Sequence, residues 1–409
     1  MNPASLFWPG DHRAGDVFSP EAYGRALVAV EVGWLRVLAT SGPAPASAAD
    51  TLAQVALESD DLVRIATDAE GGGNPVIPLL AVLRSRLPDE GAKWLHKGLT
   101  SQDVVDTALM LCARSALEHL TDDLGRCVEA LAELAQRHRQ TIMVGRTLTQ
   151  YAVPITFGLK AAGWLDAVLD ALDGIVVARN GLRVQCGGAA GTLAAVVELA
   201  GDHGLDWSAA LAAELSLADS RPWHTRRAPV TAVGDALLTT TDALGHLASD
   251  IVVLSRPEIA EVSEPAGEGR GGSSTMPQKR NPVLAVLIRR AAATAPLLGS
   301  QLHLASAQAV DERPEGAWHT EWQPLALLAR HAVTAGSQAA ELLAGLEVHA
   351  DAMAATVQRA MPGLLAERAS VRALTGQSAE AADPSRYLGA TQSIIDATLD
   401  RAERARTQR

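Results

Sequence analysis

The stretch VVDTALMLCARSALEHLTDDLGRCVEALAELAQRHRQ, residues 104–140, points to the fold class of this chain. Apolar side chains recur along it at steps of three and four residues. They are Leu109, Cys112, Ala116, Leu120, Leu124, Cys127, Leu131 and Leu134. This spacing places them on one face of a helix. The stretch therefore predicts one long amphipathic helix with a seam like that of a coiled coil.

Similar helical patterns recur further along the chain, at about residues 153–180, 226–255, 283–309 and 322–346. At 1.5 Å per residue, helices of such lengths are roughly 35 to 50 Å long. They are rich in alanine and carry more than one apolar stripe, so they need packing partners on several sides. We therefore predict an all-α protein whose long helices form a bundle that also packs against other subunits.

The composition agrees with this prediction. Of the 409 residues 48% are hydrophobic but only 3% are aromatic, which favours helices packed through small side chains over a β-sandwich. The formal net charge of −12 argues against a general nucleic-acid surface. A small anionic substrate remains compatible with it, because local cations can outweigh the overall field. The three cysteines show no CxxC or metal-ligand spacing, which predicts a reducing compartment without disulfides.

The chain divides by texture into three predicted regions. Short helices separated by turns occupy residues 1–95, the long helices occupy 96–350, and weaker patterns fill 351–409. The charged end, DRAERARTQR, is predicted to fray into solvent. No basic segment followed by an apolar run opens the chain, and no run of 18 apolar residues occurs. We therefore expect a cytoplasmic protein with no signal peptide and no membrane span.

Three polar loops interrupt the helical pattern. The first, HKGLTSQDVVDT at residues 96–107, places Thr100, Ser101 and Asp103 at the start of a long helix. Ser101 suits an N-cap, and the free backbone N–H groups behind it suit an anion. Taken alone, the stretch is explained more simply by an ordinary capped helix start.

The second polar loop is GRTLTQYAVPITFG, residues 145–158. It ends one helix and leads through Pro154 into the next. Its polar candidates are Arg146 and Gln150. Taken alone, it reads as a turn between helices with a solvated arginine.

The third polar loop, GEGRGGSSTMPQKRNP at residues 267–282, begins with a literal GxGxxG. A dinucleotide site requires a strand before that motif and an acidic residue about 20 positions later. Here a helical pattern precedes it, and no acidic residue lies between Glu268 and Asp311. We therefore interpret it as a glycine loop that carries Ser273 toward a helix start. Neighbouring cations stabilise a serine alkoxide, which suits proton transfer at a carbon beside a carboxylate.

These loops resemble, in the same order, the signature segments of the fumarase/aspartase superfamily: HxGxTSxD, GRTxxQ with its downstream proline, and GSSTMPQKRNP. The resemblance implies an all-α fold with a central five-helix bundle in each subunit. It also implies a homotetramer with a core of twenty helices, in which each active site takes its three loops from three subunits. The substrate is expected to be a small polycarboxylate. The remaining histidines lack paired spacing, so we expect no metal and no organic cofactor.

The resemblance also implies roles for individual residues. Ser273 would be the proton-transfer residue, Lys279 and Asn281 carboxylate binders, and His96 a substrate or proton-network residue counted with the catalytic groups. Thr100 and Ser101 would form a carboxylate site. The other expected substrate-binding residues are Arg146, Gln150, His224, Arg226, Ser274, Met276 and Arg313. For His224, Arg226 and Arg313, expected near a third carboxylate, a structural ion pair or a capped turn is an alternative.

Two positions distinguish the branches of the superfamily. Where many of its lyases carry a His after GRT and a Glu seven residues beyond the signature Lys, this chain has Leu148 and Val286. Without that acid relay, an amine or nucleotide leaving group loses its proton donor. The muconate cycloisomerase branch needs none, because a carboxylate of the substrate adds to a double bond of the same molecule. Segments resembling that branch are GNPVIPL (73–79), TFGLKAAGWLDA (156–167), QCGGAAGTLAA (185–195), PWHTRR (222–227) and DERPEGAWHTEW (311–322).

Two alternatives stay open. One is a β-elimination lyase acting on another succinate derivative, like adenylosuccinate or nitrosuccinate lyases. Leu148 favours it, since an aromatic residue is expected there in the muconate branch. The other is a scaffold without activity, like the lens crystallins that descend from this superfamily.

Overall fold

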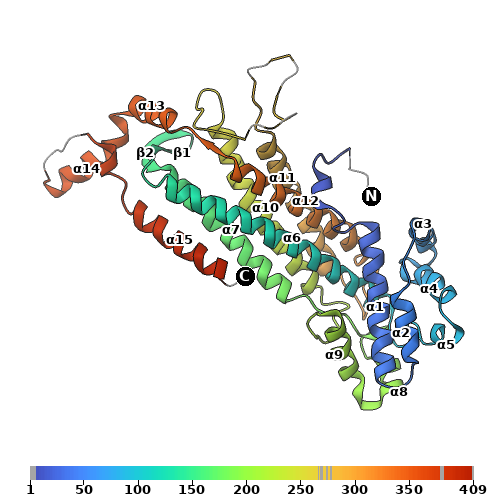
Figure 1. The fold of residues 1–409 in the computed structure, drawn as a ribbon. Helices are drawn as coiled ribbons and strands as arrows, with labels where there is room; N and C mark the ends of the chain where they lie inside the picture. Colours follow the sequence, from blue (N-terminus) through green and yellow to red (C-terminus); the bar gives the residue numbers. More distant parts are fainter. Residues whose placement is uncertain are drawn as a thin grey trace. The chain divides into compact units, whose positions relative to one another are not determined.

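The computed structural model describes residues 6–265, 267, 270–272, 275–276, 279–377 and 382–407. Nearly all of its regular structure is helical, which confirms the predicted fold class (Figure 1). The five long helices are α6 (Ser101–Arg137), α7 (Phe157–Asn180), α10 (Ala228–Leu254), α11 (Val283–Ala307) and α12 (His319–Ala344). Their bounds lie within a few residues of the predicted ranges, because long periodic segments carry the strongest sequence signal.

The other elements are shorter. The remaining helices are α1 (Pro20–Thr40), α2 (Ala46–Ala53), α3 (Ser59–Asp68), α4 (Val76–Ser85), α5 (Asp89–Ala92), α8 (Ala194–Ala200), α9 (Gly204–Leu215), α13 (Ala350–Ala360), α14 (Ala366–Thr375) and α15 (Thr391–Thr407). The strands are β1 (Ile142–Thr147), β2 (Gln150–Thr156), β3 (Val262–Ser263) and β4 (Glu347–Val348). They form two antiparallel pairs, β1 with β2 and β3 with β4.

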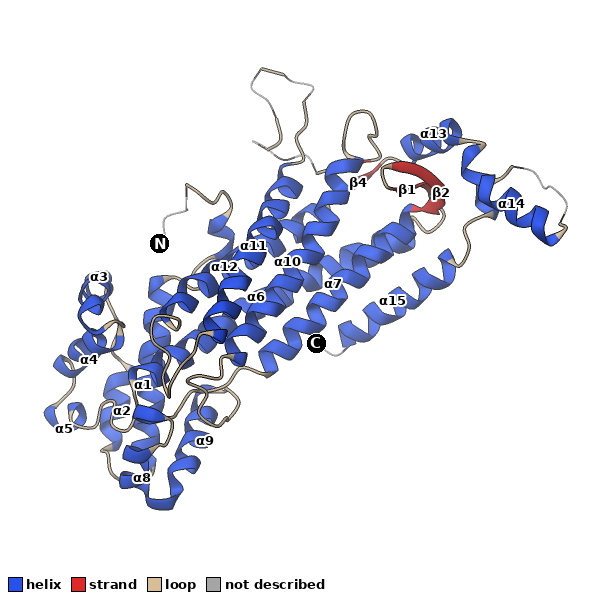
Figure 2. Ribbon diagram, turned by 180° about the vertical axis from the view of Figure 1, so that it is seen from behind, coloured by secondary structure: helices blue, strands red, loops and turns tan. Residues whose placement is uncertain are grey.

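The second polar loop is a β-hairpin, not the predicted turn between helices (Figure 2). Its strands pair from Ile142 opposite Thr156 to Thr147 opposite Gln150. The two tip residues, Leu148 and Thr149, have positive φ angles of 48° and 70°, as a two-residue hairpin turn requires. The β-branched residues on both sides of the tip favour strands, and Pro154 does not prevent pairing at the margin of so small a sheet.

The chain packs into two compact units. The first unit comprises Met1–His119, Ile175–Leu238 and Ala295–Val333, and the second comprises Leu120–Gly174, Thr239–Thr294 and Thr334–Arg409. Each unit contains one segment of every long helix, so the same five helices supply the core of both. This grouping does not test the predicted boundaries near residues 95 and 350, which stay predictions.

Glycines bring α10 and α11 close together. In the first unit, a Cβ atom on Gly234 would lie 2.6 Å from Cδ1 of Leu302. In the second unit, a Cβ atom on Gly245 would lie 2.4 Å from the Cβ atom of Ala292. Non-bonded carbon atoms do not approach so closely in a packed interior. The prediction of helices packed through small residues is therefore confirmed for α10 and α11, in the first unit and in the second.

By length and composition alone, α10 and α11 could cross a membrane. In α10, 56% of the most apolar 18-residue window is buried inside the protein. In α11, the corresponding share is 33%. Core helices of globular proteins pass the same test. In α11 the side chains of Val286, Leu297 and Leu304 are exposed. This helix thus carries apolar surface that the described part of the chain leaves uncovered, and the absence of a membrane span stays a prediction.

The C-terminal segment does not fray as predicted, because it is helical to Thr407. Arg401 of α15 lies 3.3 Å from a carboxylate oxygen of Asp166 and 2.7 Å from those of Asp170 and Asp173. These aspartates lie on successive turns of α7, beside α15 (Figure 1). The charged composition that suggests fraying in the sequence therefore holds the helix in place.

We predict that Gly245→Ala lowers the free energy of unfolding by about 1 to 3 kcal/mol, because α10 and α11 must move apart to accept the new methyl group. Gly163→Ala on α7 is the matched control, since a Cβ atom there meets nothing within 4 Å. It should leave the free energy unchanged or raise it by about 1 kcal/mol. Urea unfolding at equal protein concentration checks both. Equal stability of the two variants would contradict the close contact.

Candidate functional site

The first polar loop lies in the first unit and is organised by one carboxylate. Asp103 is fully buried. One oxygen, Oδ1, accepts hydrogen bonds from the Gly187 N–H (2.9 Å) and from His224 Nε2 (2.8 Å). The other, Oδ2, accepts from the N–H groups of Thr100 and Gly188, both at 2.9 Å. Four donors compensate this buried charge, and they tie the start of α6 to two other segments.

The start of α6 differs in detail from the prediction, which placed the N-cap at Ser101. The helix begins at Ser101, so Thr100 precedes it. Asp103, the third helical residue, accepts from the N–H of Thr100, as in the returning half of a capping box. The Thr100 and Ser101 side chains are half-buried, and neither hydroxyl has a hydrogen-bond partner within the described ranges. Both are therefore available to a ligand.

His96 is held by α1, which the sequence did not suggest. Its Nδ1 lies 2.7 Å from Oε1 of Glu31, a fully buried residue in the middle of α1. One turn further on, Trp34 donates its Nε1–H to the carbonyl of Lys97 at 2.6 Å. The only signal for Glu31 in the sequence is an acidic residue inside the apolar run ALVAVEVGWL.

His224 and Arg226, both expected near a third carboxylate, are placed differently. His224 is buried against Asp103, whereas Arg226 is exposed and donates to the carbonyl of Pro222 at 2.9 Å. Arg313 is also exposed. Contact of any of the three with a substrate stays a prediction.

The buried arginine of this region is Arg227, which the sequence did not single out. It lies 2.7 Å from Asp106 and 2.6 Å from Glu321, and Trp318 donates to Asp106 at 2.9 Å. Burial raises the pKa of Glu321, and the guanidinium of Arg227 offsets this only in part. All three side chains are buried. Asp106 lies in α6, Arg227 directly precedes α10, and Glu321 lies in α12, so this shared ion pair joins three segments of the first unit.

In the second unit, Arg146 is paired and not solvated. Two of its guanidinium nitrogens each lie 2.9 Å from a carboxylate oxygen of Glu261, which is fully buried. Gln150, further along the hairpin, is exposed and donates to the Thr149 hydroxyl at 3.2 Å. At the hairpin tip, the side chain of Leu148 is 96% exposed. An apolar side chain thus protrudes at the position where the resemblance leads one to expect a histidine in many lyases.

The third polar loop is described only in part. Ser273, Ser274, Pro277 and Gln278 lie outside the described residues, so the predicted roles of the two serines stay predictions. Met276 and Lys279 are exposed.

The base of this loop is closed by hydrogen bonds. The backbone N–H and the side-chain amide of Asn281 both donate to the carbonyl of Gly271, at 2.9 and 3.0 Å. Glu264 accepts from the N–H groups of Leu284 (3.1 Å) and Ala285 (2.7 Å) at the start of α11. Burial raises the pKa of Glu264, and these hydrogen bonds partly counter it. Because Asn281 holds Gly271 here, its predicted carboxylate contact also stays a prediction.

A cavity of about 260 Å³ lies beside this base. Its charged lining residues are Arg270, Lys279 and Arg280, with Glu264 as the acidic member. The excess of cations suits a small anion. Among all described residues, no group of three or more His, Cys, Asp and Glu side chains could hold a metal ion, and the absence of cofactors stays a prediction.

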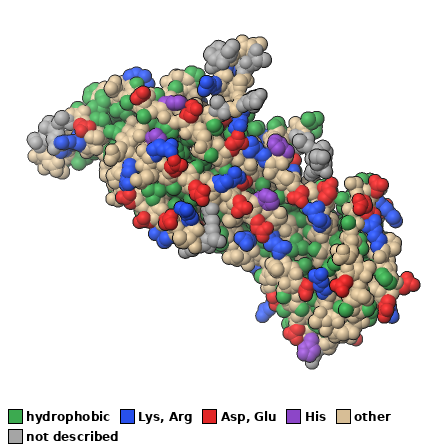
Figure 3. All heavy atoms as spheres, in the orientation of Figure 1, with side chains coloured by type: hydrophobic (Ala, Val, Ile, Leu, Met, Phe, Trp, Pro, Cys, Tyr) green, Lys and Arg blue, Asp and Glu red, His purple; other side chains and the backbone are tan. Residues whose placement is uncertain are grey.

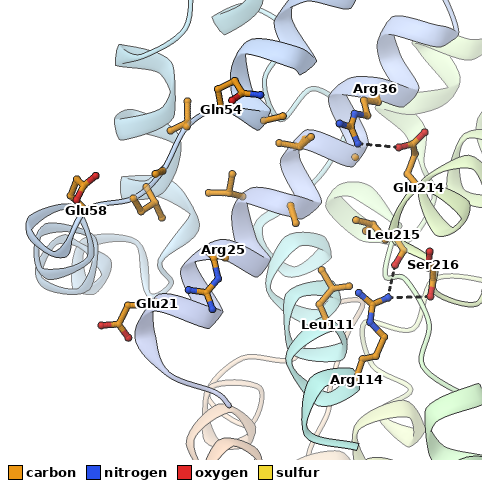
Figure 4. A pocket seen from close by; sticks show the side chains of 18 residues that line it. Glu21, Arg25, Arg36, Gln54, Glu58, Leu111, Arg114, Glu214, Leu215 and Ser216 are labelled. Atoms are coloured by element: carbon orange, nitrogen blue, oxygen red, sulfur yellow. Dashed lines mark hydrogen bonds and ion pairs between the residues drawn. The ribbon is translucent and has the colours of Figure 1, made fainter. Parts of the chain in front are cut away.

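A larger cleft, of about 870 Å³, runs along α1 in the first unit (Figure 4). It contains none of the predicted site residues. Arg36 pairs across it with Glu214 at 3.5 Å, and Arg114 donates to the carbonyls of Leu215 and Ser216 at 2.7 and 3.3 Å. The charged residues that line the cleft are balanced, with Glu21, Glu58 and Glu214 against Arg25, Arg36 and Arg114, so it is a poorer anion site than the cavity beside Lys279.

Comparison with known proteins identifies relatives along nearly the whole chain. A family model described as lyase matches residues 22–297. A nitrosuccinate lyase from Streptomyces davaonensis is 40% identical, across 95% of this chain and 92% of that protein. A 3-carboxy-cis,cis-muconate cycloisomerase from Bradyrhizobium diazoefficiens is 37% identical, across 91% and 92%. The crystal structure of the 3-carboxy-cis,cis-muconate lactonizing enzyme from Pseudomonas putida has a TM-score of 0.82 over 96% of this chain and 97% of that chain, at 29% identity.

We predict that Asp103→Asn lowers the free energy of unfolding by about 3 to 5 kcal/mol, because an amide nitrogen would face N–H donors in a buried site. Asp206→Asn is the control. Asp206 also pairs with a histidine, His203, at 2.9 Å, but its side chain is 76% exposed. That variant should change stability by less than about 1 kcal/mol. Urea unfolding of both proteins tests this, and a similar small loss in each would refute the central role of Asp103.

Proposed function

Because this chain belongs to the fumarase/aspartase superfamily of lyases, we propose that it is a 3-carboxy-cis,cis-muconate cycloisomerase, which forms carboxymuconolactone in protocatechuate catabolism. The observation that carries the choice of reaction is the likeness to four 3-carboxy-cis,cis-muconate cycloisomerases, which are 36% to 40% identical across 87% to 91% of this chain. The apolar side chains Leu148 and Val286, where a proton relay would otherwise be, argue only against amine and nucleotide leaving groups. Both are exposed, at 96% and 51%. A reaction without a leaving group that must be protonated suits such a site.

In the proposed reaction, an oxygen of one substrate carboxylate adds to a double bond of the same molecule. As this C–O bond forms, the π electrons move to the carbon beside another carboxylate, which spreads the charge over its oxygens. Ser273 then donates a proton to that carbon. In ring opening, the same serine removes the proton and the C–O bond breaks. The nucleophile is ionised and intramolecular, so its addition needs no external base.

The substrate is a small polycarboxylate, and its negative charge is matched by the cations beside the third loop. Lys279 would hold the carboxylate that receives charge in the transition state, together with Asn281. Thr100, Ser101 and His96 would bind a second carboxylate at the start of α6. The other members of the proposed site are Arg146, Gln150, His224, Arg226, Ser274, Met276 and Arg313.

The enzyme would act as a cytoplasmic homotetramer, with active sites shared between subunits. The uncovered apolar residues of α11, including Leu297 and Leu304, support this assembly, because a second copy of the chain would cover them. On the face drawn in Figure 3, acidic and basic side chains are interspersed, which supports a small-molecule partner over nucleic acid.

A β-elimination that releases nitrite is the second candidate, favoured by the nitrosuccinate lyase that is 40% identical across 95% of this chain. In this reaction Ser273 would remove a proton beside a carboxylate, the C–N bond would break, and nitrite would leave as a stabilised anion. Nitrite needs no proton donor. The apolar residues Leu148 and Val286 therefore do not argue against it, although they argue against amine or nucleotide leaving groups.

We predict that the purified protein consumes 3-carboxy-cis,cis-muconate. Ring closure removes the conjugated diene, so ultraviolet absorbance should fall as lactone forms. The same preparation is given nitrosuccinate, and fumarate and nitrite are measured. Release of both products without loss of diene absorbance would replace the first candidate by the second. No turnover of either acid would instead favour a scaffold without activity.

We predict that Ser273→Ala lowers kcat by about 10³-fold or more, because the proton-transfer group is removed. Light scattering should show the same assembly for the variant and the wild-type chain. Thr275→Ala, in the same loop, is the control and should retain most of the activity. Unchanged turnover in the Ser273 variant would exclude its proposed role.

A further inference from the structure

We propose that Glu31 is a positioning residue that, through Nδ1 of His96, makes His96 the carrier of the proton that lactone formation consumes. The Glu31–His96 pair would thereby return one proton to the site in each turnover, a task distinct from the protonation of a leaving group. The inference rests on the proposed function and deepens it.

The burial of Glu31 is the first support. Its side chain is fully buried, and Oε1 lies 2.7 Å from Nδ1 of His96. Its other oxygen, Oε2, is buried without a hydrogen-bond partner among the described residues. A buried carboxylate with so few donors is costly in a fold. The imidazole is the one described group that compensates it, so the pair behaves as a unit.

The geometry also selects which ring nitrogen is left for chemistry. An ionised carboxylate only accepts hydrogen bonds, so Nδ1 of His96 donates its N–H to Glu31. Nε2 is then the atom free to give or take a proton. The side chain of His96 is 16% exposed, so the ring is neither sealed in the core nor free to rotate in solvent.

The backbone around His96 is held in an unusual conformation. His96 has a positive φ of 64°, which is rare for a residue with a side chain. Gly98 has a φ of 93°, and a Cβ atom there would lie 2.9 Å from Val196. The Trp34 hydrogen bond to the Lys97 carbonyl secures the turn between them. Such a conformation persists where surrounding contacts enforce it, and it often accompanies functional sites.

The proton balance of the proposed reaction requires such a carrier. When the lactone forms, one carboxylate charge disappears into the ester and the new carbanion takes up one proton. A serine hydroxyl has a single proton to give, so the site must receive another from solvent for each turnover. Nε2 of His96 would pass this proton on while Nδ1 stays hydrogen-bonded to Glu31. In a nitrite elimination, the same pair would accept the proton that the substrate releases.

Glu31→Gln keeps the size of the side chain and removes its charge. We expect kcat to fall about 100-fold or more, as when the carboxylate that orients a catalytic histidine is neutralised, with KM changed less than about threefold. His96→Asn should lower kcat at least as much. In the double variant, Glu31→Gln should add no further loss, because Glu31 acts through His96.

Trp34→Phe is the matched control. It removes the neighbouring hydrogen bond from the same face of α1 and loosens the same turn, but it leaves the Glu31–His96 pair intact. We expect its kcat to fall less than about tenfold. Equal losses in the Trp34 and Glu31 variants, or additive losses in the double variant, would reduce Glu31 to a structural role and overturn the proposal.

A second measurement needs no substrate. In solid-state NMR of protein labelled with ¹⁵N-histidine, the signals absent from the His96→Asn variant belong to His96. In the wild-type protein Nδ1 should carry a hydrogen-bonded proton, and Glu31→Gln should shift these signals. Identical His96 signals in both proteins would overturn the proposal. Failure of the proposed function gives a different result from failure of this inference. In that case the wild-type chain itself converts neither carboxymuconate nor nitrosuccinate.

Discussion

The buried carboxylate of Asp103 is the interaction on which the first unit depends. It accepts hydrogen bonds from Thr100, Gly187, Gly188 and His224, which belong to three separate segments of the chain. Without such an anchor, four donors, three of them in buried hydrogen bonds, would lose their acceptor at once. The start of α6, which is proposed to bind a carboxylate, is therefore held in position by residues that are far from it in the sequence. Asp103 satisfies the backbone N–H of Thr100, so the hydroxyls proposed to bind a carboxylate are not needed for that contact.

The second unit holds its loop differently. Glu264 and Asn281 join the two ends of the glycine-rich loop at the start of α11. These contacts are hydrogen bonds to backbone N–H and C=O groups close to the loop ends. The first loop is held instead by one buried carboxylate that accepts from three segments of the chain, so the two loops are anchored by different means.

The long helices were predictable because their apolar periodicity is a local property of the chain. The β1–β2 hairpin was not, because its strands are short and its tip residues, Leu148 and Thr149, are not typical of positive-φ turns. The motif residues Thr100 and Lys279 were identified by resemblance. Glu31 and Arg227 were missed because their importance comes from partners 65 and 94 residues away, and no sequence spacing reveals those contacts.

The composition of the two units also bears on how the chain folds during synthesis. The first unit includes residues up to Val333, and within it Arg330 donates a hydrogen bond to Asp11, which lies 319 residues earlier in the sequence. The second unit includes the C-terminal helices. Neither can therefore be completed before most of the chain has left the ribosome. Contacts of such long range slow folding and prolong the exposure of apolar helices. A nascent chain of this design depends on protection from aggregation until its last third has been made.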